Sequence, residues 1–81
     1  MKLNEEEIED IAFLKEFKKL TNLNLNQNEI TDISILNDLK ILSDLRLYSN
    51  QMTDISALYN LKDLTHLVGL ILPVPFLFPF F

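Results

Sequence analysis

The apolar residues of this chain recur in one order, and that order repeats after 22 residues. Each period reads L-x-x-L-x-L-x-x-N-x-I-x-D-I-S-x-L-x-x-L, with methionine in place of the first isoleucine in the second copy. The two most complete copies begin with LTNLNLNQNEITDIS (residues 20–34) and LSDLRLYSNQMTDIS (residues 42–56). A coil of this length cannot bury its own apolar edge, so such copies must stack on one another. The pattern therefore predicts a repeat protein whose coils share one core.

The L-x-L part of each copy predicts a short strand. Its leucines alternate with polar residues, so Leu23 and Leu25 point to one side of the strand and the neighbouring asparagines to the other. Apolar residues at spacings of three follow the strand, which is typical of irregular or 3₁₀-like turns that carry the chain back. Stacked strands then form a parallel sheet, and the return segments form the layer behind it.

An asparagine follows each predicted strand among apolar neighbours, at Asn28 and Asn50. A buried amide is costly unless its donor and its acceptor are both paired. Stacked copies can supply those partners from the backbone of the neighbouring coil. We therefore interpret these two residues as a structural asparagine ladder rather than as a binding site.

The two segments resemble leucine-rich repeat proteins. The 22-residue form with N-x-I-T-D-I-S-x-L is similar to the bacterial internalins and to the leucine-rich regulatory subunit of protein phosphatase 1. The resemblance covers residues 8–67 and implies an α/β fold, namely a short right-handed solenoid with a parallel β-sheet on its concave face and a 3₁₀ or irregular convex side. It also implies that the protein binds another protein through the concave strands.

The chain divides into a repeat domain at residues 1–67 and a tail at residues 68–81. Within the repeat domain we expect, in chain order, a cap at residues 1–19, repeats at 20–41 and 42–63, and a broken third repeat from residue 64. The cap is predicted to be helical over residues 5–19, because Asn4 is a good N-cap and the three acids after it suit a helix start. The same N-terminus lacks the apolar stretch of a secretory signal, so we expect cytoplasmic residence.

Composition narrows the chemistry that the chain can perform. Its 7 Lys+Arg against 12 Asp+Glu give a formal charge of −5, which argues against nucleic acid as a partner. The chain has no cysteine and one histidine, so a thiol nucleophile and a Cys-based zinc site are excluded. Asp44 and His66 could align as an acid–base pair, but no nucleophile or phosphate loop accompanies them. We therefore expect no enzymatic activity, no metal and no cofactor.

The polar side of the predicted strands supplies the candidate binding residues. Their outward positions fall into columns, because each strand of a stack contributes one residue to every column. The candidate partner-binding residues are Asn22, Asn24, Asn26, Asp44, Arg46, Tyr48 and His66. Arg46 and Tyr48 are the strongest candidates, since these residue types contribute most to interface energies. The alternative is a solvated polar face that binds nothing.

The end of the chain reads LVGLILPVPFLFPFF from Leu67 and carries no charge. Three interpretations are open: a frameshift or truncation that replaced the expected repeat, an apolar cap across the last coil, or a superficial membrane contact by the phenylalanines. A membrane crossing is not expected, since a spanning helix needs about 20 apolar residues and few prolines. The chain is therefore a self-sufficient binding module, a fragment of a longer leucine-rich repeat protein without independent activity, or a membrane-associated peptide.

Overall fold

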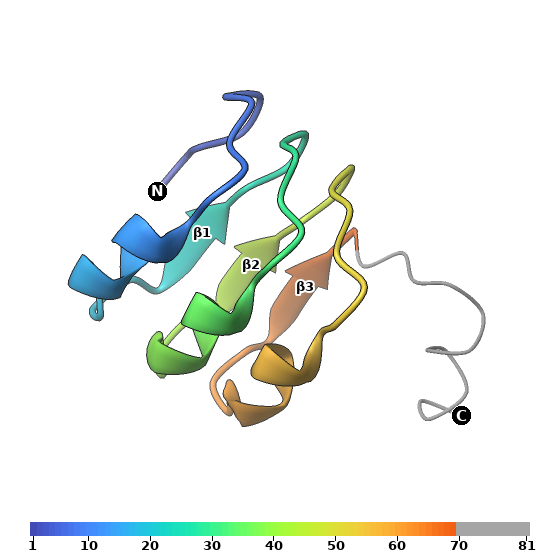
Figure 1. The fold of residues 1–81 in the computed structure, drawn as a ribbon. Helices are drawn as coiled ribbons and strands as arrows, with labels where there is room; N and C mark the ends of the chain where they lie inside the picture. Colours follow the sequence, from blue (N-terminus) through green and yellow to red (C-terminus); the bar gives the residue numbers. More distant parts are fainter. Residues whose placement is uncertain (70–81) are drawn as a thin grey trace.

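A computed structural model describes residues 1–69, in which three short strands alternate with three 3₁₀ helices (Figure 1). The elements in chain order are η1 (Ala12–Glu16), β1 (Asn22–Asn24), η2 (Ser34–Asp38), β2 (Asp44–Arg46), η3 (Ser56–Asn60) and β3 (His66–Val68). The strands form one parallel sheet in the order β1-β2-β3. The expected parallel sheet and 3₁₀ return segments are confirmed.

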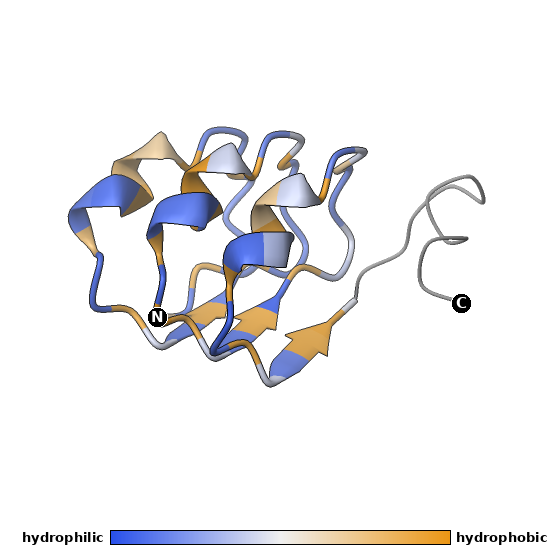
Figure 2. Ribbon diagram, turned by 90° about the horizontal axis from the view of Figure 1, so that it is seen from below, coloured by the Kyte–Doolittle hydropathy of each residue, from blue (hydrophilic) through white to orange (hydrophobic). Residues whose placement is uncertain are grey.

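The sheet and the 3₁₀ helices form two layers, with the apolar core between them (Figure 2). Leu23, Leu45 and Leu67 stand opposite one another across the three strands. Because successive strand residues point to opposite faces, this register turns all three leucines toward the core and the residues beside them toward solvent. The isoleucines and leucines of the return segments, such as Ile33 and Leu36, close the core from the other side.

Each 3₁₀ helix follows the same aspartate turn. Asp32 Oδ1 accepts a hydrogen bond of 2.9 Å from the backbone N–H of Ser34. Asp10 and Asp54 accept the same bond from the residue two places later. An aspartate that bonds its own backbone in this way favours a turn. The aspartate of each repeat therefore starts the return segment.

Asn28 joins its coil to the preceding coil through hydrogen bonds. Its Nδ2 donates to the carbonyl oxygens of Leu3 and Leu25, at 2.9 and 3.0 Å. Its Oδ1 accepts from the backbone N–H groups of Glu6 and Ile8, at 3.0 and 2.9 Å. The residue is 6% exposed. Backbone groups thus pair both its donor and its acceptor, as a buried amide requires.

Asn50 makes the corresponding bonds one coil later. Its Nδ2 donates to the carbonyl oxygens of Leu25 and Leu47, at 2.8 and 3.1 Å. Its Oδ1 accepts from the backbone N–H of Ile30 at 3.1 Å. The two amides therefore join consecutive coils through backbone groups.

The helix expected over residues 5–19 is absent, so that prediction is wrong. Only Ala12–Glu16 is helical there, and it is a 3₁₀ helix. Glu5 and Glu7 have left-handed backbone conformations, with φ of 58° and 56°, which an α-helix does not tolerate. The capping signal at Asn4 therefore does not determine the structure of this segment.

The N-terminal segment instead forms a further coil of the stack. Lys2 bridges Asn24 in parallel, and the backbone N–H of Leu3 donates to the Asn24 carbonyl at 2.8 Å. The same coil supplies the backbone groups that pair with Asn28. Stacking buries apolar surface and satisfies that amide, whereas a helix of about 15 residues or fewer is only marginally stable by itself. The repeat pattern therefore outweighs the local helix signal.

The last strand is the open edge of the described residues. Leu67 is 38% exposed, although Leu45, its neighbour in β2, is 0% exposed. Gly69 follows with φ of +81°, and a Cβ at this position would collide with the backbone of Tyr48. Residues 70–81, with the three interpretations of the tail, lie outside the described residues. No helix within residues 1–69 is long and apolar enough to span a membrane.

Candidate functional site

The outward side chains along the sheet form one largely polar surface, which we call the strand face. It consists of Lys2, Asn22, Asn24, Asn26, Asp44, Arg46, Tyr48, His66 and Val68. Two columns cross the three strands, Asn22–Asp44–His66 and Asn24–Arg46–Val68. The sheet thus brings residues that are 22 positions apart in the sequence to a strand spacing of about 4.8 Å. All seven partner-binding candidates lie here, and their role in binding stays a prediction.

Arg46 is oriented by a carboxylate of its own strand. Its Nε donates to Asp44 Oδ1 at 3.3 Å, and the two side chains are 47% and 24% exposed. An ion pair this exposed contributes about 0–1 kcal/mol to stability, so its main effect is to restrict the guanidinium. Within residues 1–69 the Nη groups of Arg46 have no hydrogen-bond partner. They remain available to a ligand.

Asn24 and Asn26 turn their amide oxygens toward the backbone. Asn24 Oδ1 accepts from the Asn26 N–H at 3.0 Å, and Asn26 Oδ1 accepts from the Tyr48 N–H at 2.6 Å. Because a backbone N–H can only donate, the oxygen of each amide must face it, and the NH₂ group points elsewhere. The side chain of Tyr48 itself is 49% exposed. The strand face therefore presents amide donors beside an accessible tyrosine.

A hollow of about 420 Å³ opens on the strand face beside β1. Its polar lining is Lys2, Asn22, Asn24, Asp44 and Arg46. Lys2 is the residue of this site that was not predicted from the sequence. The signal that identifies it is the repeat itself, because MKL at residues 1–3 stands 22 positions before LNL at residues 23–25.

Asp44 and His66 lie in register on neighbouring strands but are engaged with other residues. Asp44 bonds Arg46, and His66 Nδ1 lies 3.0 Å from Thr65 Oγ1. Among the residues that the structure describes, no group of three or more His, Cys, Asp or Glu side chains could hold a metal ion. The geometry of the strand face suits contact with a partner.

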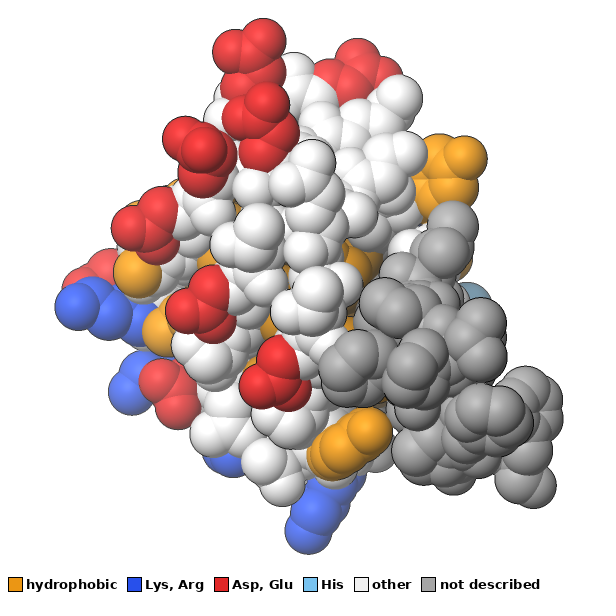
Figure 3. Space-filling model, turned by 45° about the vertical axis from the view of Figure 1, so that its right-hand side comes forward, with side chains coloured by type: hydrophobic (Ala, Val, Ile, Leu, Met, Phe, Trp, Pro, Cys, Tyr) orange, Lys and Arg blue, Asp and Glu red, His pale blue; other side chains and the backbone are white. Residues whose placement is uncertain are grey.

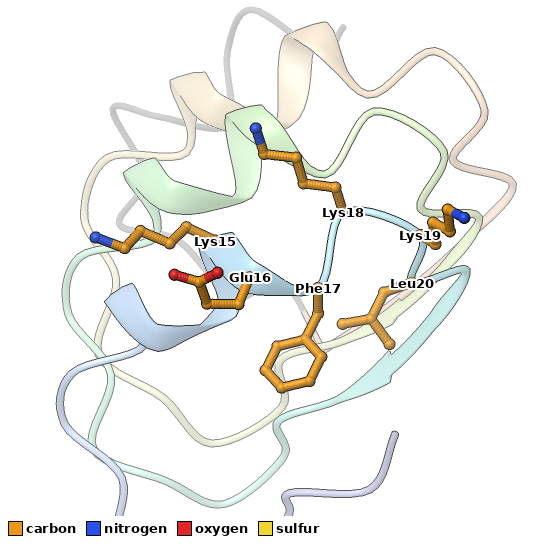
Figure 4. A pocket seen from close by; sticks show the side chains of 6 residues that line it. All are labelled: Lys15, Glu16, Phe17, Lys18, Lys19 and Leu20. Carbon is orange, nitrogen blue, oxygen red and sulfur yellow. The ribbon is translucent and has the colours of Figure 1, made fainter.

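A second hollow, of about 520 Å³, lies at the N-terminal end of the stack (Figure 4). Phe17 and Leu20 border the same space, whereas the ammonium ends of the lysines extend away from it (Figure 4). Phe17 occupies the same repeat position as Leu39, which is fully buried. Phe17 is nevertheless 42% exposed, because no coil within residues 1–69 covers it. The hollow exists because the stack of coils ends here. No polar groups converge in it, so it offers no specific binding site for a ligand.

The acidic side chains lie largely away from the strand face. Figure 3 shows them from the upper border to the middle of one face of the molecule, with Lys and Arg along its left and lower borders. The backbone N–H and hydroxyl of Ser34 lower the pKa of Asp32, and those of Ser56 lower the pKa of Asp54. These carboxylates stabilise the turns, because their oxygens accept hydrogen bonds from the backbone that follows them.

Stacked 22-residue coils with a parallel sheet on one side and 3₁₀ helices on the other define an internalin-like leucine-rich repeat fold. The structure is similar to the crystal structure of internalin C2 from Listeria monocytogenes, with a TM-score of 0.74 and 36% sequence identity. The match covers 83% of this chain and 28% of the internalin C2 chain. No protein-family model and no curated protein matches the chain. The expected likeness to the regulatory subunit of protein phosphatase 1 stays a prediction.

Proposed function

We propose that this protein is a non-catalytic, cytoplasmic module that binds another protein through the strand face. Arg46 and Tyr48 are the central contacts, and the remaining candidates of the strand face surround them. The internalin-like fold supports this proposal, because binding of other proteins is the role that the resemblance to leucine-rich repeat proteins implies.

The observation that carries the proposal is the placement of Arg46 at the end of the middle strand and of Tyr48 directly beyond it. The two residues are two positions apart, so their side chains point to the same side of the sheet. Both side chains are close to half exposed, and β2 lies between β1 and β3. Arginine and tyrosine are enriched among the residues that dominate binding energy, and such residues cluster near the centre of an interface.

Affinity capture from cells that express the protein tests this proposal. The wild type is compared with the double variant Arg46→Ala/Tyr48→Ala by quantitative mass spectrometry of the captured proteins. We expect the double variant to lose its specific partners by about tenfold or more, since residues at the centre of an interface typically contribute about 2 kcal/mol or more.

The matched control is Tyr59→Ala/Lys62→Ala. It removes one tyrosine and one cation from η3 and the turn after it, in the layer behind the sheet. The control is expected to retain the partners. Equal recovery with wild type and Arg46→Ala/Tyr48→Ala would reject the strand face as the binding surface.

The exposed third strand favours a second role. In that role the chain is one part of a longer leucine-rich repeat protein and has no activity of its own. Leu67 and Val68 are both exposed, and a further coil stacked on β3 would cover them. Thermal unfolding separates the two roles. A cooperative transition of the monomer supports a self-sufficient module, whereas a non-cooperative melt or soluble aggregates support the second role.

A further inference from the structure

We infer that the strand face selects an acidic peptide segment of its partner, with a carboxylate held above Asn24 between Lys2 and Arg46. This inference rests on the proposed function and specifies the chemistry of the partner. Three features of the strand face lead to it: the polarity of its hydrogen-bonding groups, the orientation of Arg46, and the distribution of charge over the molecule.

The column formed by Lys2, Asn24 and Arg46 presents hydrogen-bond donors. Lys2 bridges Asn24, and Asn24 pairs with Arg46, so the three residues lie side by side at about the strand spacing of 4.8 Å. Asn24 uses its Oδ1 to accept from the Asn26 N–H, which leaves its NH₂ group for a ligand. Lysine and arginine side chains contain no acceptor. A ligand at this column must therefore supply acceptors.

The outward position two residues after Asn24, beyond the end of β1, has the same polarity. Asn26 gives its Oδ1 to the Tyr48 N–H, so its NH₂ group is also left for an outside partner. Donors therefore continue beyond the column in the strand direction. A peptide segment can meet this arrangement with one carboxylate over Asn24 and a backbone carbonyl over Asn26, because both are acceptors.

Arg46 is oriented in a way that suits a carboxylate. Its Nε is bonded to Asp44, which leaves the two Nη groups as a planar pair of donors. Guanidinium and carboxylate groups match in a bidentate geometry, and such charge-assisted bonds are roughly twice as strong as neutral ones. Within residues 1–69 neither the Nη groups of Arg46 nor the ammonium of Lys2 has a partner. Lys2 and Arg46 both line the hollow of about 420 Å³, which has room for a few side chains of a bound peptide.

The charge distribution admits an acidic partner at the strand face, although the chain as a whole is acidic. Lys2 and Arg46 against Asp44 give the strand face a formal charge of 2 − 1 = +1, within a chain of −5. The rest of the molecule therefore carries −5 − 1 = −6, although Lys15, Lys18 and Lys19 form a second basic cluster at the N-terminal end of the stack. Since the Debye length is about 10 Å at 0.1 M salt, those distant acids are largely screened from a ligand bound at the hollow.

Selection from a random-peptide display library tests the inference. Peptides are selected on the wild-type protein after removal of those that bind Arg46→Ala/Tyr48→Ala. Enrichment of Asp and Glu in the selected peptides is the expected result. Selected peptides that are uncharged or basic would overturn the inference and leave strand-face binding intact. If no peptide depends on Arg46 and Tyr48, both the proposed function and the inference fail.

The most enriched acidic peptide is then compared with its Gln and Asn counterpart in a double-mutant cycle. Arg46→Gln and Lys2→Gln are each expected to weaken binding of the acidic peptide about tenfold more than binding of the neutral peptide, because hydrogen bonds to charged groups are the stronger ones. Lys40→Gln is the control, since it removes the same charge from an exposed turn outside the hollow. Equal losses for both peptides, or equal losses in the control, would overturn the inference.

Discussion

The middle strand and the last strand contain the same leucine at the same position of the repeat, yet the two leucines differ in burial. Leu45 of β2 is fully buried between β1 and β3, whereas Leu67 of β3 is 38% exposed. The difference arises from the neighbours, because the position in the repeat is identical. A coil of this protein is therefore stabilised by the coils on its two sides rather than by its own sequence alone.

The two ladder asparagines show the same dependence. Asn28 accepts from two backbone N–H groups of the preceding coil, while Asn50 accepts from one, that of Ile30. Asn28 is buried and Asn50 is half-buried. One residue type at one repeat position therefore contributes differently according to its place in the stack.

Substitution of the two strand leucines should give the largest contrast. Leu45→Ala is expected to lower the free energy of unfolding by about 2–5 kcal/mol, as buried leucines do when a cavity replaces them. Leu67→Ala is expected to cost less than about 1 kcal/mol, because its side chain is already partly in water. Chemical denaturation followed by circular dichroism measures both values.

The milder pair Leu45→Val and Leu67→Val extends this comparison if Leu45→Ala does not fold. The order of the two losses should be the same in both pairs. Equal losses at the two positions would show that the last strand is buried to the same degree as the middle strand, contrary to the structure.

Substitution of the two ladder asparagines should give the next largest contrast. Asn28→Ala leaves buried backbone groups without partners and is expected to cost about 2–4 kcal/mol, whereas Asn50→Ala should cost about 1–2 kcal/mol. Thermal and chemical unfolding of both variants measure the difference. A larger loss for Asn50→Ala would contradict the assignment of Asn28 as the more fully paired amide.

The smallest expected effect is a dependence of stability on pH that comes from the aspartate turns. Because the pKa values of Asp32 and Asp54 are lowered in the folded protein, the unfolded chain binds protons first as the pH falls. Their contribution is therefore present above about pH 4 and is lost as the pH falls through the lowered folded-state values.

Asp32→Asn/Asp54→Asn should reduce this loss of stability in acid, since an amide oxygen still accepts the serine N–H but does not titrate. Urea unfolding between neutral and acidic pH measures the slope. Asp38→Asn serves as the control, because it removes an exposed carboxylate of η2 that forms no such turn. A slope in the double variant equal to that of wild type would exclude these two groups as its source.

The repeat offset predicts the sheet and the columns of the strand face, because both follow from which residues stand 22 positions apart. That reasoning places Asn24 beside Arg46 and Asp44 beside His66, as the structure has them. The helix predicted over residues 5–19 was wrong because its signal is local, whereas the segment is held by contacts with a later coil.

Other features of the site depend on contacts that a sequence pattern does not contain. The orientation of the Asn26 amide is set by the backbone of Tyr48, which comes from the next coil. The Nε of Arg46 is engaged by Asp44, a contact that depends on the rotamers of both side chains. Lys2 lies outside the resemblance to leucine-rich repeats, which begins at Ile8, although the offset of 22 residues continues to the first residue.

The most direct test of strand-face binding is a titration followed by backbone amide chemical shifts. The ¹⁵N-labelled protein is titrated with the acidic peptide that the display selection yields. The largest shifts are expected at Asn24, Asn26, Arg46 and Tyr48, with little change over η2 and η3. Shifts that fall on the 3₁₀ helices while the strand amides stay unchanged would contradict the strand face as the binding surface.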